Sequence, residues 1–290
     1  MIKLYSYGKI NIFLDIKGRL PNGYHLIKTV MQSIDLHDEI FIEKYDKNEI
    51  HIECSDVNIP TDEKNTCYKA ASIIKDKYHI NSGVNIRINK TIPAEAGLAG
   101  GSSNSAAVIR GLNILWDLNL SEDEMLNIGL KIGADVPFCL VGGTYLAEGI
   151  GEKLTKLNDF KWNHILVVKP DFSMSTAFVY NNLNENLYNT YKEKNEILNY
   201  IKSGDFNKTA KATFNTLEKV VEDFHPEIND IKNLMIQNGA LSSLMTGSGS
   251  AVFGLFKNKE SLNLAYSKIS IIYPKTFKTR TNIEGTQIFV

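Results

Sequence analysis

The chain has 290 residues, 43% of them hydrophobic and 22% charged, so it fits neither a disulfide-stapled peptide nor a disordered segment. Its 32 Lys and Arg residues balance 33 Asp and Glu residues, which argues against nucleic-acid or membrane partners attracted by overall charge. Charges also interrupt the first apolar stretch, as they would not in a signal peptide or membrane span. Three scattered cysteines, Cys54, Cys67 and Cys139, indicate buried thiols in a reducing compartment. We expect a cytoplasmic globular protein, and the sequence leaves its oligomeric state open.

The first half of the chain predicts strands followed by helices. Alternating apolar and polar side chains predict antiparallel strands at residues 10–16, 29–36, 39–44 and 49–54. Helical spacing, another strand, a Gly-rich loop and a second helix follow at residues 65–78, 84–89, 93–101 and 102–116. Ser121 and Glu124 form a capping box for a further helix that ends near residue 132.

The second half mixes helices and strands after a polar segment at residues 151–162, which indicates a domain boundary. We therefore predict one domain over residues 1–155 and another over residues 156–290. Within the second domain we expect helices between residues 175 and 238, one more helix at 259–267, and strands at 165–169, 241–246, 251–256, 271–277 and 286–290. Partly segregated blocks of strands and helices predict an α+β fold.

The segment PAEAGLAGGSS, residues 93–103, predicts a phosphate-binding loop. Gly97, Gly100 and Gly101 let the backbone curl so that its amides point at one centre, and Ser102 and Ser103 add hydroxyl donors at a helix start. A tight turn whose serines merely cap the helix is the alternative. The signatures of P-loop and Rossmann proteins are missing from the sequence, so this is a different kind of phosphate site.

A second Gly-rich turn, MTGSGS at residues 245–250, lies between two apolar strands. Taken alone, it reads as a hairpin turn with a bulge. In the same way, Lys9 alone would be a solvated residue of an edge strand, and Asp135 alone would belong to a turn or a helix cap.

Together these segments resemble the GHMP small-molecule kinases, which carry an N-terminal Lys strand, a Gly-rich loop and a C-terminal Gly-Ser turn. Here the three motifs are YGKIN, PAEAGLAGGSS and MTGSGS, in that order and across nearly the whole chain. The resemblance implies a two-domain fold, with a first domain like domain 2 of ribosomal protein S5 and a ferredoxin-like second domain. Because the Gly-Ser turn belongs to the second domain, both domains should line one cleft.

The resemblance also implies ATP-dependent phosphorylation with Mg²⁺. It matches the family's catalytic pair to Lys9 and to Asp135 in GADVPF. Asp135 would hold the attacking hydroxyl or accept its proton, and Lys9 would stabilise the transferring phosphoryl group, because phosphoryl transfer needs mainly positioning and charge stabilisation. The nucleotide would lie on Pro93, Ala94, Glu95, Ala96, Gly97, Leu98, Ala99, Gly100, Gly101, Ser102 and Ser103. Ser102 or Ser103 could contribute to the Mg²⁺ site, whose ligands the sequence does not identify.

The elements NGYH and TVMQ, at residues 22–25 and 29–32, resemble those GHMP kinases that phosphorylate the 2-hydroxyl of a cytidine-diphosphate-linked methylerythritol for isoprenoid synthesis. By this resemblance the substrate-binding residues are Asn11, Tyr24, His25, Lys90, Thr176 and Tyr180. Two of these rings, Tyr24 and Tyr180, would stack on the cytosine. A homoserine or mevalonate kinase is the first alternative, and a nucleotide sensor without activity is the second.

Ala99 departs from the family pattern, in which glycine is common at this position. A methyl group at this position is tolerable if the φ angle of Ala99 stays negative.

Overall fold

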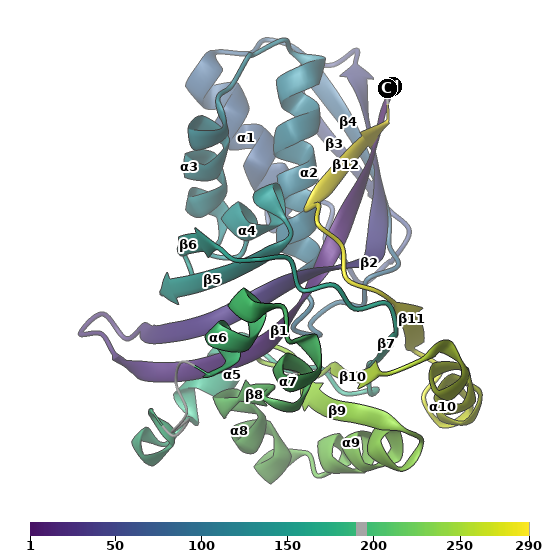
Figure 1. Cartoon of the computed structure of the whole chain (residues 1–290). Coiled ribbons are helices and arrows are strands. Elements are labelled where there is room, and N and C mark those ends of the chain that lie inside the picture. Colours follow the sequence, from purple (N-terminus) through teal and green to yellow (C-terminus); the bar gives the residue numbers. More distant parts are fainter. Residues whose placement is uncertain (190–195, 290) are drawn as a thin grey trace.

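The computed structural model describes residues 1–189 and 196–289, and it shows the predicted α+β fold. A large mixed sheet runs from the top of Figure 1 to its lower left, and a smaller antiparallel sheet lies at the lower right. The strands of the large sheet are β1 (Ile2–Arg19), β2 (His25–Tyr45), β3 (Ile50–Cys54), β4 (Gly83–Asn89), β5 (Thr144–Gly149), β6 (Lys153–Lys156), β8 (Phe214–Asn215) and β12 (Thr286–Phe289). Those of the small sheet are β7 (Ile165–Val168), β9 (Ala240–Met245), β10 (Val252–Phe256) and β11 (Thr276–Thr279).

A long hairpin of β1 and β2 runs through the large sheet (Figure 1). The two strands predicted at residues 29–36 and 39–44 are one continuous strand, because β1 pairs with β2 on both sides of the polar segment that suggested a break. That segment contains Asp38, which is fully buried and whose carboxylate accepts from the backbone amides of Thr91 and Ile92, just beyond the end of β4. The strand at residues 49–54 is also corrected: β3 runs parallel to β4, since helix α1 (Thr66–Tyr78) connects them as a crossover.

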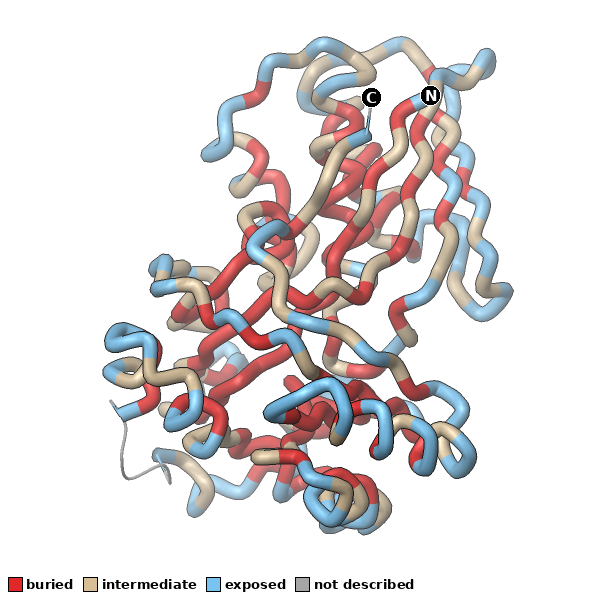
Figure 2. Tube along the Cα trace, turned by 45° about the vertical axis from the view of Figure 1, so that its right-hand side comes forward, coloured by how far each residue is buried: buried red, intermediate tan, exposed pale blue. Residues whose placement is uncertain are grey.

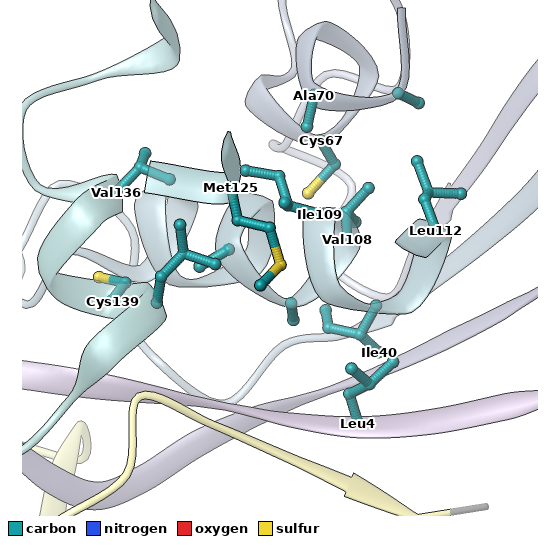
Figure 3. Close-up of a cluster of buried hydrophobic side chains, with 14 of the residues drawn as sticks. Leu4, Ile40, Cys67, Ala70, Val108, Ile109, Leu112, Met125, Val136 and Cys139 are labelled. Atoms are coloured by element: carbon teal, nitrogen blue, oxygen red, sulfur yellow. The ribbon is translucent and has the colours of Figure 1, made fainter. Parts of the chain in front are cut away.

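Four helices cover one face of the large sheet: α1, α2 (Gly100–Leu115), α3 (Glu122–Ile132) and α4 (Val136–Val141). Their apolar sides form a core in which Leu4 and Ile40 of the sheet meet Ile109 and Leu112 of α2 (Figure 3). Cys67 and Cys139 also lie in this core as free thiols, as predicted, and Cys54 is half-buried. Burial raises the pKa of Cys67 to about 12, which makes its thiol unreactive.

The small sheet has the strand order β11-β7-β10-β9 and is antiparallel throughout. This order, with helices before β9 and before β11, is that of the expected ferredoxin-like domain. The helices of this half are α5 (Thr176–Asn181), α6 (Glu196–Ser203), α7 (Phe206–Lys211), α8 (Thr216–Phe224), α9 (Glu227–Gln237) and α10 (Lys259–Ile272), with the short 3₁₀ turn η1 at Glu185–Leu187.

One predicted strand in this half is wrong. Residues 271–277 were expected to be extended, but α10 continues to Ile272 and β11 begins only at Thr276. Leu262, Ala265 and Ile269 pack one side of α10 into the core, and this packing carries the helix through two β-branched residues that face solvent. The last predicted strand, 286–290, is confirmed as β12 up to residue 289, and residue 290 lies outside the described residues.

The two halves share a buried layer, visible as continuous red along the middle of the tube in Figure 2. Ile12 and Phe13 of β1 pack there with Val167 of β7 and Phe253 of β10. In addition, β8 and β12 come from the second half of the chain and pair with β1. The division predicted at residue 155 falls at the end of β6 and stays a prediction. None of the described helices is long and apolar enough to cross a bilayer.

Candidate active site

A cavity of about 1110 Å³ lies where the two halves meet, and it contains nearly all of the predicted site residues. Its walls include Lys9 and Asn11, residues 93–102, Asp135, the turn with Tyr24 and His25, and Gly247 to Gly249 of the second Gly-rich turn. Lys90, Thr176 and Tyr180 also line it, and Ser103 is the one predicted site residue that does not. The volume exceeds what one drug-sized ligand needs, so two small-molecule substrates fit together.

Lys9 lies at the centre of this cavity because β1 is irregular at that point. The register of β1 against β2 shifts between Tyr7 and Lys9 and again between Asn11 and Phe13, and such bulges re-aim side chains. The side chain is buried, and Nζ donates to Asn11 Oδ1 at 2.7 Å and to the Gly97 carbonyl at 2.8 Å. Lys9 is therefore not a solvated edge residue, and its ammonium is held in a fixed position.

Asp135 stands at the N-terminus of α4, a helix that the sequence analysis did not predict. Its carboxylate makes no capping hydrogen bond, although the backbone carbonyl of Asp135 accepts from the Cys139 amide. Instead, Oδ2 lies 3.7 Å from Lys9 Nζ, and about a third of the side chain is exposed towards the cavity. Because two of the three ammonium protons of Lys9 are taken, the third remains for Asp135 or a bound anion.

The Gly-rich loop enters α2 with its amides available. Ala99 precedes the helix, and the first backbone amide recorded in the helical pattern is that of Ser103, which donates to the Ala99 carbonyl. The preceding amides, of Gly100, Gly101 and Ser102, have no acceptor within the helix and lie at the positive end of its dipole. Ala99 has a φ angle of +58°, so the condition of a negative φ is not met, and the methyl group is accommodated at a conformational cost.

The two serines of the loop differ. Ser103 is fully buried, and its hydroxyl donates to the Tyr7 carbonyl at 2.7 Å. This hydrogen bond connects α2 to β1 and occupies the hydroxyl proton. This corrects the expectation that Ser103 offers its hydroxyl to phosphate. Ser102 lines the cavity, and the described residues provide no hydrogen-bond partner for its hydroxyl. Ser102 is therefore the serine of this pair that can meet a ligand.

The second Gly-rich turn is more than a hairpin connection. The Thr246 hydroxyl accepts from the Asn11 amide at 2.9 Å, which joins the turn to the Lys9 strand. Gly97 contacts the same turn so closely that a Cβ atom there would lie 2.1 Å from the Thr246 carbonyl oxygen. Ser248 is hydrogen-bonded to Thr176 across 2.9 Å. Both glycine turns thus meet at Lys9.

At another part of the cavity, aromatic side chains surround His25. Tyr24 is 60% exposed at the rim, whereas His25 is buried. The Tyr180 ring lies 5.1 Å from the His25 ring at 33°, and Nε2 of His25 is 3.0 Å from the Tyr188 hydroxyl. Burial lowers the pKa of His25, and the nearby Arg19 lowers it further, so this imidazole is neutral near pH 7. A neutral imidazole and flat rings suit an uncharged base.

Several residues in or beside the cavity were missed by the sequence analysis. Arg19 lines the cavity near His25, Tyr188 contacts His25 without lining the cavity, and a third wall comes from residues 59–60 and 64–66. Asn65 caps α1 by accepting from the Cys67 amide, and its Nδ2 donates to the Pro60 carbonyl, so it holds this wall in place. The sequence could have predicted Asn65 as the N-cap of α1, because asparagine is a preferred capping residue before a helical pattern. Only the fold shows that α1 begins beside the Gly-rich loop.

Known proteins with similar sequences or structures agree on the family. A family model described as the GHMP kinases N-terminal domain matches residues 65–143, and the GHMP kinases C-terminal model matches residues 197–275. A 4-diphosphocytidyl-2-C-methyl-D-erythritol kinase of Clostridioides difficile (strain 630) is 44% identical over 288 residues, covering 99% of this chain and 97% of the relative. The enzyme of the same name from Caldicellulosiruptor bescii is 45% identical over 285 residues, covering 98% and 99%.

Solved structures give the same result. A crystal structure of 4-(cytidine 5'-diphospho)-2C-methyl-D-erythritol kinase superposes with a TM-score of 0.82 at 26% identity, covering 97% of this chain and 99% of that chain. A homoserine kinase from Cytophaga hutchinsonii has a TM-score of 0.79 at 18% identity, covering 99% and 97%. The second likeness shows a common fold only.

Proposed function

This chain belongs to the GHMP kinase family, and from that premise we propose that it transfers phosphate from ATP to the 2-hydroxyl of 4-diphosphocytidyl-2-C-methyl-D-erythritol, a step of isoprenoid precursor synthesis. Full-length relatives that share 44–45% of its residues are named for this acceptor. One observation carries the proposal: a buried lysine, a partly exposed carboxylate beside it, an amide-rich helix start and an aromatic site around a neutral histidine all line one cavity.

In this proposal Lys9 and Asp135 act on the reacting groups. Lys9 is anchored by Asn11 and Gly97, so its ammonium is already oriented when negative charge moves between the phosphoryl oxygens. Asp135 orients the acceptor hydroxyl and takes its proton late in the transfer, because a loose transition state creates little need for an early base. The 3.7 Å separation leaves room for the two side chains to share one reacting oxygen.

The nucleotide phosphates would lie on the amides at the start of α2, where the helix dipole and unpaired N–H groups favour an anion. Lys90, which lines this region, adds positive charge. The cytosine would stack on Tyr24 and Tyr180, as the sequence resemblance implies, and His25 would hydrogen-bond to the polar edge of the base.

The acidic side chains that line the cavity decide whether Mg²⁺ could bind there. No group of three or more potential metal-binding side chains occurs among the described residues, and Glu95 and Asp135 are the acidic residues that line the cavity. This suits Mg²⁺, which is held by few protein oxygens together with water and substrate phosphates. Glu95 and Ser102 would hold the ion, and its charge would neutralise the phosphate oxygens.

The proposal is tested by measuring ATP consumption with three acceptors: the cytidine-diphosphate methylerythritol, homoserine and mevalonate. We expect phosphate transfer to the first alone, because Tyr24, His25 and Tyr180 provide a site for a base that the other two acceptors lack. Transfer to homoserine or mevalonate would assign the chain to another GHMP activity. ATP binding without transfer to any acceptor would favour a nucleotide sensor.

A further inference from the structure

Asp38 is a buried carboxylate that the proposed mechanism does not use. It lies in the middle of β2, its exposure is 0%, and it does not line the cavity. A buried charge is costly unless several donors satisfy it. The partners of Asp38 therefore indicate what this charge stabilises.

Those partners come from both ends of the Gly-rich loop. Oδ1 accepts from the amides of Thr91 and Ile92 at 2.6 and 2.8 Å, just before the loop begins at residue 93. Oδ2 accepts from Asn104 Nδ2 at 2.8 Å, on the first turn of α2 after the loop. One carboxylate thus ties the entrance of the loop to its exit.

Oδ2 also pairs with the ammonium of Lys90, which in turn donates to Asn104 Oδ1 at 3.3 Å. Lys90 lies beside the first residue of α2: a Cβ atom on Gly100 would be 3.2 Å from Nζ. The carboxylate therefore fixes the position of a cationic group at the same helix start whose amides are unpaired. The residues around His25 are not among the hydrogen-bond partners of Asp38.

We propose that Asp38 is a positioning residue for ATP, which acts by clamping both ends of the Gly-rich loop and by aiming Lys90 at the nucleotide. The inference rests on the proposed function, because it takes the loop as the nucleotide site. Preorganised hydrogen-bonding groups bind more tightly because less ordering remains to be done on binding. Loss of the clamp should therefore weaken ATP and leave the acceptor site intact.

Asp38→Asn tests this with little change in shape. The new side chain keeps an oxygen for the amides of Thr91 and Ile92, but its NH₂ group faces the Lys90 ammonium and the NH₂ group of Asn104. Asp15→Asn is the matched control, since Asp15 is also fully buried and paired with a lysine but contacts neither loop end. We expect Asp38→Asn to weaken ATP at least tenfold in calorimetric titrations, with affinity for the cytidine acceptor changed less than twofold. Asp15→Asn should change neither affinity.

Hydrogen exchange without nucleotide provides a second readout that does not depend on the proposed function. The NH₂ group of Asp38→Asn repels the Lys90 ammonium and the NH₂ group of Asn104, which displaces the side chain and weakens its hydrogen bonds to Thr91 and Ile92. Exchange at these two amides should therefore accelerate, while distant strands stay protected. Should this variant fail to fold, Asn104→Ala leaves the entrance contacts in place and removes the exit contact, together with the hydrogen bonds of Asn104 to Lys90 and Ser6, and it should weaken ATP about threefold. Unchanged ATP affinity, equal loss of both ligands, or the same loss in Asp15→Asn would overturn the inference. Accelerated exchange in a protein that phosphorylates none of the acceptors would uphold the clamp and refute the proposed reaction.

Discussion

Replacing Asp135 by Asn should lower the rate of phosphate transfer strongly while changing the stability of the fold only slightly. The substitution keeps the size of the side chain and removes its negative charge. Asp135 makes no capping hydrogen bond to α4, so the helix loses no partner. The structural consequence is confined to the ion pair with Lys9, whose Nζ and Oδ2 atoms are 3.7 Å apart.

The size of the stability loss follows from the distance between Lys9 Nζ and Asp135 Oδ2 and from the exposure of the Asp135 side chain. Two unit charges at this separation attract by about 4 kcal/mol at an effective dielectric constant near 20. The Asp135 side chain is 35% exposed, so water screens much of this attraction, and the buried Lys9 ammonium keeps its hydrogen bonds to Asn11 and Gly97 when the carboxylate is neutralised, so the pair contributes about 1 kcal/mol or less. Loss of a side chain that positions the reacting hydroxyl and takes up its proton lowers a rate by roughly 10²- to 10⁴-fold. Asp135→Asn should therefore reduce kcat by at least about 100-fold and the free energy of unfolding by no more than about 1 kcal/mol.

The assay pairs steady-state phosphate transfer with urea unfolding. Asp35→Asn is the control, because Asp35 is also 35% exposed and pairs with Arg280 at 3.0 Å, outside the cavity. Its stability should fall by a similar amount, and its kcat should stay the same. If Asp135→Asn retained a kcat within tenfold of the parent protein, or bound ATP much more weakly, the assigned role of the carboxylate would be refuted.

Three further predictions concern individual residues of the site. The pKa of His25 is lowered by burial and by Arg19, so its contribution to stability is present above its ordinary pKa of about 6.5 and is lost as pH falls through the folded-state value. Acceptor affinity should fall over the same acidic range, and Arg19→Gln should move the midpoint of a pH titration upwards. Ala99→Gly removes left-handed strain of about 1–2 kcal/mol but gives the unfolded chain more freedom, so urea unfolding should show a gain of about 0.5 kcal/mol. Gly97→Ala would place a Cβ atom 2.1 Å from the Thr246 carbonyl oxygen at a φ of +73°, and it should destabilise the protein by about 3 kcal/mol and abolish phosphate transfer.

Each of these predictions has a result that would contradict it. A midpoint unmoved by Arg19→Gln would remove Arg19 as a determinant of the His25 pKa. A loss of stability in Ala99→Gly would mean that the methyl group contributes packing that exceeds its strain. Normal activity in Gly97→Ala would show that the two glycine turns need not stay in contact.

Local patterns in the sequence were sufficient for most of the regular elements. The capping box of Ser121 and Glu124 forms as predicted, since both of its hydrogen bonds connect residues three positions apart. Errors arose where distant partners override local preference. The last turn of α10 stays helical because Ile269 is buried against the small sheet, and β2 continues through Asp38 because amides just before the Gly-rich loop satisfy its carboxylate.

By itself the sequence determined the family, through motifs whose glycines and charged residues are required by local backbone geometry and by the chemistry of phosphate. Only the tertiary structure decided how these motifs work together. It turned Lys9 inwards through bulges in β1, assigned Ser103 to the core and Ser102 to the cavity, and brought Thr246 against Asn11 from 235 positions away. Contacts of this kind depend on how two sheets pack, and no periodicity within a short segment specifies that packing.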